Sequence, residues 1–200
     1  MADNFSFSEG TGKTGAADDV SGILYQRVKL DYGGDGSSSP VTSTAPLPVL
    51  AEMPDDVKTI TCSLDTNAYA DGDVLFATQE IASAVRNTGD SCILQSIHVV
   101  DIDDEGVDFD LVFFNAATSL GTENAAPDID DTEVLTTIGT YEFVNDYMDL
   151  GANQVRTDHG IGLELKAGAG TTSLYVAGIT RGTPTHTASG LEISFGFLRN

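Results

Sequence analysis

The chain has 200 residues, and its 31 Asp and Glu against 9 Lys and Arg give a formal net charge of −22. This imbalance excludes the function classes that need clustered Lys and Arg, namely binding to free nucleic acid and to anionic membrane surfaces. Hydrophobic residues make up 40% of the sequence, which is enough for a packed core, so the charge does not predict disorder. No apolar run has the length of a membrane span, and the first residues lack the basic and apolar regions of a secretory signal, so we expect neither.

Residues 1–57 predict an extended N-terminal arm. Four of the six prolines, at positions 40, 46, 48 and 54, fall in this part, among Gly-rich and Ser-rich stretches. Only the segment Tyr25 to Tyr32 alternates as a strand does. Because such an arm buries little surface by itself, we expect it to become ordered on a partner. The residues expected to make that contact are Tyr25, Arg27, Val28, Lys29, Leu30 and Tyr32.

Residues 58–200 predict a body of successive β-strands. Apolar and polar residues alternate, and Asp-rich or Gly-rich turns separate the alternating stretches. About eight short strands in roughly 140 residues favour a jelly-roll-like antiparallel β-sandwich. The two cysteines, Cys62 and Cys92, are too few for a disulfide framework and are expected to be buried and unpaired on strands. The predicted strands are 57–64, 73–77, 92–102, 107–115, 162–167, 173–181 and 191–198.

Three local predictions accompany this fold. Cys92 to Ile102 and Val107 to Asn115 flank an acidic turn and predict a hairpin. Asp128 to Ile138 predicts a short helix, because an Asp precedes apolar residues at helical spacing. Gln79 to Ala84 predicts a further turn of helix.

The acidic turn resembles the first half of a calcium loop. Acids occupy positions one, three and five and Gly106 occupies position six, but position twelve is Val112 instead of the bidentate Glu. A hairpin tip in which Glu105 and Gly106 supply the positive φ is therefore the favoured interpretation. A structural cation remains the alternative, with a ligand cluster of Asp101, Asp103, Asp104 and Glu105.

Motifs for catalysis or cofactor binding are not found in the sequence. Gly10 to Thr14 resembles the end of a phosphate-binding loop, but Phe7 stands where the first Gly is required. The histidines at 98, 159 and 186 have no partners at metal-ligand spacing, and His98 is expected to be a structural residue within a strand. Neither a Ser elbow nor a catalytic Cys signature occurs. The sequence therefore predicts no enzyme and no cofactor.

Several longer segments resemble virion structural proteins of tailed bacteriophages. DDVSGILYQRVKLDYGGDGSSSPVTSTAPLPV, from Asp18 to Val49, is similar to a segment near the N-termini of many such proteins. The body segments resemble phage structural proteins of unassigned role, so the similarity extends from Asp18 to the end of the chain. The body segments are GDVLFATQEIASAV, LQSIHVVDIDDEGVDFDLVFFN and SLYVAGITRGTPTHTASGLEISFGFLRN.

The resemblance implies a non-enzymatic component of the particle. Within that class, a sandwich with an arm suits a capsid decoration or cement protein on the capsid exterior, made in the host cytoplasm. Its implied partners are the major capsid protein, bound by strand addition of the arm, and further copies of itself, expected as a trimer. Nucleic acid and membranes are not expected as partners. Two alternatives remain: a tail or head-fibre component, including one that binds a receptor or carbohydrate, and a lectin or carbohydrate-active enzyme outside phages.

Overall fold

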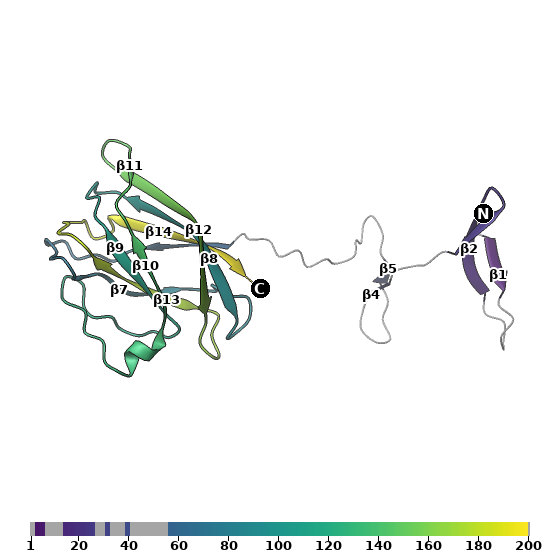
Figure 1. The fold of residues 1–200 in the computed structure, drawn as a ribbon, viewed down its shortest axis with the longest axis horizontal. Coiled ribbons are helices and arrows are strands. Elements are labelled where there is room, and N and C mark those ends of the chain that lie inside the picture. Colours follow the sequence, from purple (N-terminus) through teal and green to yellow (C-terminus); the bar gives the residue numbers. More distant parts are fainter. Residues whose placement is uncertain (1–2, 7–13, 27–30, 33–38, 41–55, 200) are drawn as a thin grey trace. The chain divides into compact units, whose positions relative to one another are not determined.

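A computed structural model describes residues 3–6, 14–26, 31–32, 39–40 and 56–199 (Figure 1). The chain divides into two units, residues 1–51 and residues 52–200. The first contains a three-stranded antiparallel sheet in the order β1-β2-β3, made by β1 (Asp3–Ser6), β2 (Thr14–Val20) and β3 (Ile23–Gln26). It also contains the short pair β4 (Asp31–Tyr32) and β5 (Ser39–Pro40).

The turn between β2 and β3 explains part of this local structure. Ser21 and Gly22 both have positive φ, 56° and 82°, as a two-residue hairpin turn of the primed type requires. Of the single strand that the sequence predicted from Tyr25 to Tyr32, the structure describes the first two residues, at the end of β3, and the last two, in β4. Residues 27–30, which include four of the predicted contact residues, lie outside the described part of the chain.

The second unit, which we call the body, contains nine strands and one turn of 3₁₀ helix among its described residues. In chain order they are β6 (Asp56–Thr61), β7 (Val74–Ile81), β8 (Ser91–Asp101), β9 (Phe109–Phe114), η1 (Glu133–Thr136), β10 (Thr137–Phe143), β11 (Met148–Asp149), β12 (Gln154–Lys166), β13 (Leu174–Thr180) and β14 (Leu191–Arg199).

The strand order of the body is that of a jelly roll. One antiparallel sheet has five strands in the order β11-β12-β8-β14-β6, and the other has four in the order β10-β9-β13-β7. Apart from the two-residue β11, the chain visits the five-stranded sheet with its first, third, sixth and eighth strands and the four-stranded sheet with the others. Two interlocked Greek keys produce this alternation. The predicted all-β, jelly-roll-like sandwich is therefore confirmed.

The core fills the space between the two sheets. Every second residue of β14 is buried there, as is every second residue of β8 on either side of an irregularity at Gln95 and Ser96. Phe113 from the four-stranded sheet meets Phe195 edge to face at 5.9 Å between ring centroids. Cys62 and Cys92 are both buried and free, as predicted, and burial raises the pKa of the Cys92 thiol to about 12. The thiols therefore pack as small apolar groups.

Three of the local predictions were wrong. β8 and β9 belong to different sheets, so their connection crosses the sandwich and is not a hairpin tip. The predicted positive φ occurs at Gly106, but Asp104 and not Glu105 is the second residue that has it. The helix predicted from 128 to 138 is limited to η1, because the β-branched Thr136 and Thr137 lead directly into β10. Residues 79–81 extend β7 instead of turning into a helix, because Ile81 is needed in the core.

Candidate functional site

Asp101, the first acid of the predicted cation cluster, is buried at the end of β8. Its side chain is 1% exposed, and Oδ2 accepts hydrogen bonds from the Gly106 amide at 2.8 Å and from Gln154 Nε2 at 3.0 Å. A Cβ on Gly106 would lie 2.7 Å from Gln154 Nε2, and φ at this glycine is +59°. Asp101 thus acts as the acceptor that shapes the turn after β8.

Asp103, the second acid of the cluster, links this turn by hydrogen bonds to the loop between β13 and β14. It accepts hydrogen bonds from the amide of Thr187 at 2.7 Å and from the Thr187 hydroxyl at 3.0 Å. His186 Nδ1 lies 3.5 Å from Asp103 Oδ2, and that ring is buried. A Cβ on Gly190 would lie 1.6 Å from the same carboxylate oxygen, so only glycine fits there.

The two remaining acids, Asp104 and Glu105, do not complete a metal site in the described residues. Asp104 is exposed with φ of +59°, and Glu105 is half-buried. Among the described side chains, no group of three or more His, Cys, Asp or Glu is placed to hold a metal ion. The carboxylates of Asp101 and Asp103 are engaged by protein donors, and the cation at this turn remains a prediction.

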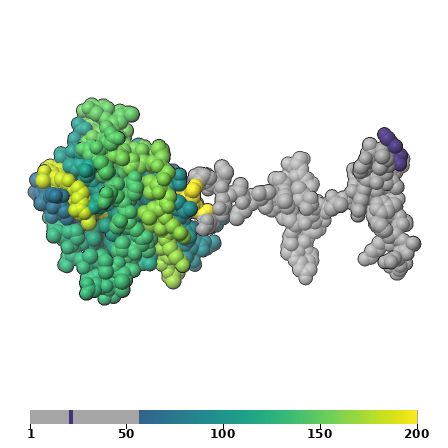
Figure 2. Space-filling model, in the orientation of Figure 1, coloured from purple at the N-terminus to yellow at the C-terminus, as the bar shows by residue number. Residues whose placement is uncertain are grey.

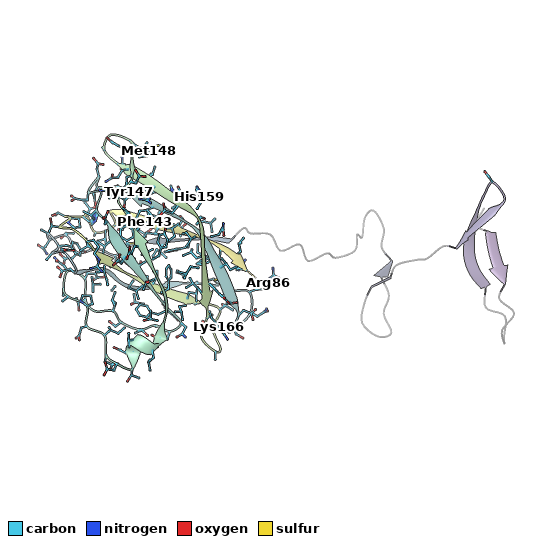
Figure 3. The ribbon with its side chains drawn as sticks, in the orientation of Figure 1. Arg86, Phe143, Tyr147, Met148, His159 and Lys166 are labelled. Atoms are coloured by element: carbon cyan, nitrogen blue, oxygen red, sulfur yellow. The ribbon has the colours of Figure 1, made fainter. Side chains whose placement is uncertain are left out.

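An apolar tip lies between β10 and β12. Val144, Met148 and Leu150 are 53%, 66% and 60% exposed, which is unusual for side chains of this size. Below them Tyr147 meets the ring of Phe143 at 5.8 Å, and Figure 3 shows Met148, Tyr147 and Phe143 following one another from the tip into the body. A hollow of about 330 Å³ next to Met148 is bordered by Asp146 and by the start of β12.

A polar network below the tip joins β10 to β12. Arg156 Nε donates to Asp158 Oδ1 at 2.8 Å, and its guanidinium stands 4.9 Å from the ring centroid of Phe143. The Tyr141 hydroxyl donates to Asp158 Oδ2 at 2.7 Å. Burial, and then this hydrogen bond, raise the pKa of Tyr141 to about 12. The network links β10 of one sheet to β12 of the other, so its charged groups have a structural role.

The outer face of the four-stranded sheet is covered by the chain itself. The segment 115–136, which we call the cover segment, runs across it and ends in η1, the short helix at the lower edge of Figure 1. Val74, Phe114, Leu120 and Ala177 form a second, smaller core beneath it. Figure 2 shows one face of the body, made largely of the green middle part of the sequence.

A polar hollow of about 290 Å³ lies at the margin of the cover segment. Thr78, Glu80 and Tyr175 from the sheet and Thr118 and Ser119 from the cover segment line it. Thr78 Oγ1 is buried without a hydrogen-bond partner. Polar groups beside an aromatic ring make this a candidate for a small polar ligand.

No segment among the described residues covers the outer face of the five-stranded sheet. Strand register places its residues in four rows across the sheet, and all of them are exposed or half-exposed. We call this surface the open face. Its rows are Val155, Val100, Glu192 and Thr61; Thr157, His98, Ser194 and Thr59; His159, Ser96, Gly196 and Val57; and Glu164, Ile93 and Leu198. Lys166 and Ser91 form a further outward-facing pair beyond the fourth row, at the margin of the face.

Hydrogen bonds across the strands order the second row of the open face. His98 Nδ1 and Thr157 Oγ1 are 2.7 Å apart, and Thr59 Oγ1 and Ser194 Oγ are 2.8 Å apart. The prediction that His98 is a structural residue in a strand agrees with the first of these contacts. In the next row a Cβ on Gly196 would lie 2.4 Å from Ser96 Oγ, so the serine hydroxyl lies over the glycine.

The open face has little net charge on a strongly acidic chain. Glu164, Glu192 and Lys166 are the charged residues that strand register places on it, whereas residues 58–200 contain 22 Asp and Glu against 6 Lys and Arg. Small hydroxyl side chains and the apolar Val57, Ile93 and Leu198 make up much of the rest. This surface was not predicted from the sequence, although a signal was present. Apart from Glu192, the outward positions of β6, β8 and β14 hold uncharged residues, chiefly Thr, Ser, Val, Ile and His.

The predicted partner-binding residues fall in the first unit. Tyr25 is in β3, opposite Asp18 of β2, and Tyr32 is in β4, opposite Ser39. Among described strands β3 pairs only with β2, so β3 is an edge strand of its sheet. The predicted contacts at Arg27, Val28, Lys29 and Leu30 lie outside the described residues.

Comparisons with known proteins complete this description. Within the described residues, no helix has the length and apolar character that crossing a bilayer requires. Comparisons of the chain with protein-family models, with curated proteins and with solved structures gave no match.

Proposed function

We propose that the chain is a non-enzymatic structural protein of a bacteriophage particle, a decoration or cement protein that binds the major capsid protein on the outside of the shell. The observation that carries this proposal is the division of the chain into a jelly-roll body and a separate small N-terminal unit. A folded body with a distinct attachment segment suits a protein that is added to a surface. The resemblance of Asp18 to Val49 to phage virion proteins points in the same direction.

The edge strand β3 supports attachment by strand addition. Its outer edge offers main-chain donors and acceptors to an extended segment of the capsid protein, with Tyr25 at a fixed register on that strand. Arg27 and Lys29, two of the nine basic residues, follow directly in the sequence and would meet acidic groups of the partner. The main-chain bonds would supply affinity and the side chains would supply register.

The acidic surface supports an exposed position on the particle. Net charge far from zero keeps a protein dispersed, and many copies on one shell would give the particle a repelling coat. The resemblance further suggests a trimer on the shell, which the symmetry of the added density in a reconstruction of the particle would test. The near-neutral open face is the exception to this coat and is considered below.

The proposal is tested on particles of the virus whose genome encodes the chain. Shells lacking the protein are mixed with labelled full-length chain, and bound label is measured after sedimentation. We expect saturable binding at the outer surface, visible as added density in a reconstruction of the particle. Binding that fails at every ratio of chain to shell, or density inside the shell, would contradict the proposal.

A shortened chain beginning at Asp56 tests the role of the N-terminal unit. Circular dichroism first establishes that the body has kept its β structure. We then expect loss of shell binding, because the edge strand is gone. Full affinity in the shortened chain would place attachment on the body instead.

The polar hollow favours a second candidate function, a tail or head-fibre component that binds a receptor carbohydrate. Sugars bind to aromatic rings flanked by polar groups, and Tyr175 with Thr78 and Glu80 offers this combination. Titration with a panel of monosaccharides, followed by nuclear magnetic resonance, would show shifts at these residues. Tyr175→Ala should abolish the shifts, and a panel without any response removes this candidate.

A further inference from the structure

We propose that the open face is a self-association surface, on which a second copy of this chain packs face to face about a two-fold axis. The inference stands on the body alone and does not rest on the particle function proposed above. Its starting point is the contrast between the sheets: the cover segment buries the outer face of one, and no described segment covers that of the other. Val57 and Ile93 are left 64% and 39% exposed there.

The net charge of the chain indicates which kind of molecule binds to the open face. A basic partner would be attracted to the acidic parts of the body and gains nothing from a neutral face. An acidic partner is repelled least where carboxylates are few and a base is present, and the copy of a chain with net charge −22 is such a partner. Because charges more than ~8 Å apart are largely screened at physiological salt, the groups inside the contact decide the outcome. Glu164 and Glu192 are the carboxylates there, and Glu164 lies near the margin of the face, two residues from the outward-facing Lys166.

The size of the face is adequate for a stable pair. Four strands at a spacing of ~4.8 Å and about nine residues at ~3.3 Å each give a flat area of roughly 19 Å by 30 Å. Specific interfaces bury about 800 Å² of accessible surface on each partner, and side chains raise the accessible area of a sheet well above its flat area. Sheets that pack through small and β-branched side chains approach to about 10 Å, as in the interior of a sandwich.

The rows suggest where the axis lies. An axis along the row of Thr59, Ser194 and His98 brings that row onto itself in the second copy. The row of Glu192 then faces the row of Ser96 and Gly196. Gly196 leaves space for the Glu192 carboxylate of the other copy, and the Ser96 hydroxyl is a donor for it. Such a contact is self-complementary and produces pairs, whereas a trimer needs two different patches.

Sedimentation equilibrium of the full chain tests this inference. We expect a pair whose association strengthens as salt is raised, because salt screens the repulsion between two acidic bodies. Thr59→Asp places two carboxylates opposite each other on the axis and should raise the dissociation constant by about tenfold or more. The matched control is Thr140→Asp, which adds the same charge to an exposed threonine of β10, outside the open face, and should leave the constant unchanged.

Each other outcome would overturn the inference. A chain that stays monomeric at all concentrations and salts has no such contact. A pair that Thr59→Asp and Thr140→Asp weaken equally associates through another surface. Association that weakens with salt depends on ion pairs, whereas the proposed axis sets neither Glu164 nor Glu192 opposite Lys166 of the other copy. A mass of three chains requires a different contact. Circular dichroism of both variants verifies that the fold is unchanged.

Discussion

The outer faces of the two sheets differ in whether another described segment of the chain covers them. On the four-stranded sheet, the cover segment adds Leu120 above Phe114 and makes a second core. On the five-stranded sheet, the outward residues of β6, β8 and β14 stay accessible and are hydroxyl-bearing, apolar or His, with little charge. One outer face is thus covered by a segment of the same chain, and the other has the composition of a surface that binds another molecule.

The largest difference should appear when one apolar side chain is shortened on each face. Phe114→Ala removes a fully buried ring beneath the cover segment and should lower the free energy of unfolding by about 3–5 kcal/mol. Val57→Ala removes two methyl groups from a side chain that is 64% exposed and should change that free energy by less than ~0.5 kcal/mol. Urea denaturation of both variants at a concentration where the chain is monomeric measures the two values.

Equal losses of unfolding free energy in these two variants would contradict the difference between the covered face and the open face. A small loss in Phe114→Ala would mean that the cover segment does not hold a core in solution. A large loss in Val57→Ala would mean that the open face is covered in the monomer.

Glycine positions offer a second test of the same contrast, with a smaller effect. A Cβ on Gly178 would lie 2.4 Å from Cε1 of Phe76, a ring that is fully buried between the sheets and has no room to move. We expect Gly178→Ala to cost about 1–3 kcal/mol of unfolding free energy through overpacking. On the open face, a Cβ on Gly196 would meet only the hydroxyl of Ser96 at 2.4 Å.

Gly196→Ala should therefore cost less than ~1 kcal/mol, because Ser96 can rotate into solvent. Thermal unfolding of both variants measures the difference. If Gly196→Ala is as destabilising as Gly178→Ala, the serine is held in place by something that covers it.

The strand pattern in the sequence predicted the fold class but not every strand. β8, β9 and β14 alternate over most of their length and were predicted within two residues of their bounds. β10 was missed because Gly139 interrupts its alternation. A side chain there would press on Leu163 and Leu165 at 3.2 and 3.1 Å, so tertiary packing, not strand propensity, selects this glycine.

Pairing and surface could not be predicted from the pattern. Alternation tells which side of a strand is apolar but does not name its neighbour, so the hairpin of β8 with β9 was a wrong prediction. The first half of β12 was missed because Gly160 and Gly162 have φ of 70° and 71° at a shift in register. The open face depends on residues from four strands, and their neighbourhood exists only once the strand order is known.

Asn124 tests how the cover segment is held, with an intermediate effect. It has φ of +57°, its amide donates to the Val74 carbonyl at 2.9 Å, and Nδ2 donates to Asp65 Oδ1 at 3.1 Å. Asn124→Ala loses the side-chain bond and places a Cβ in the left-handed region, so we expect a loss of about 1–2 kcal/mol in unfolding free energy. Asn124→Gly keeps the backbone conformation accessible and should lose less than the alanine variant. If Asn124→Gly loses as much unfolding free energy as Asn124→Ala, the whole effect is due to the hydrogen bond with Asp65.

The smallest predicted effect is the acid sensitivity of that same bond. Hydrogen bonds from the Asn67 amide, from Asn124 Nδ2 and from Asn67 Nδ2 hold the pKa of Asp65 below its ordinary value. A lowered pKa in the folded state contributes stability above the ordinary value of about 3.9, and that stability is lost as the pH falls through the folded pKa. Asp65→Asn should therefore melt below the unchanged chain at neutral pH, and the gap between the two melting temperatures should close as the pH falls below about 4. Because Asp65 contacts the cover segment and not the open face, the protection factors of amide hydrogen exchange, corrected for the intrinsic rate at each pH, should fall between β9 and β10 at acid pH while those of β8 and β14 stay high. Protection factors that fall equally in β8 and β14 would show that acid opens the whole sandwich and that Asp65 does not hold the cover segment separately.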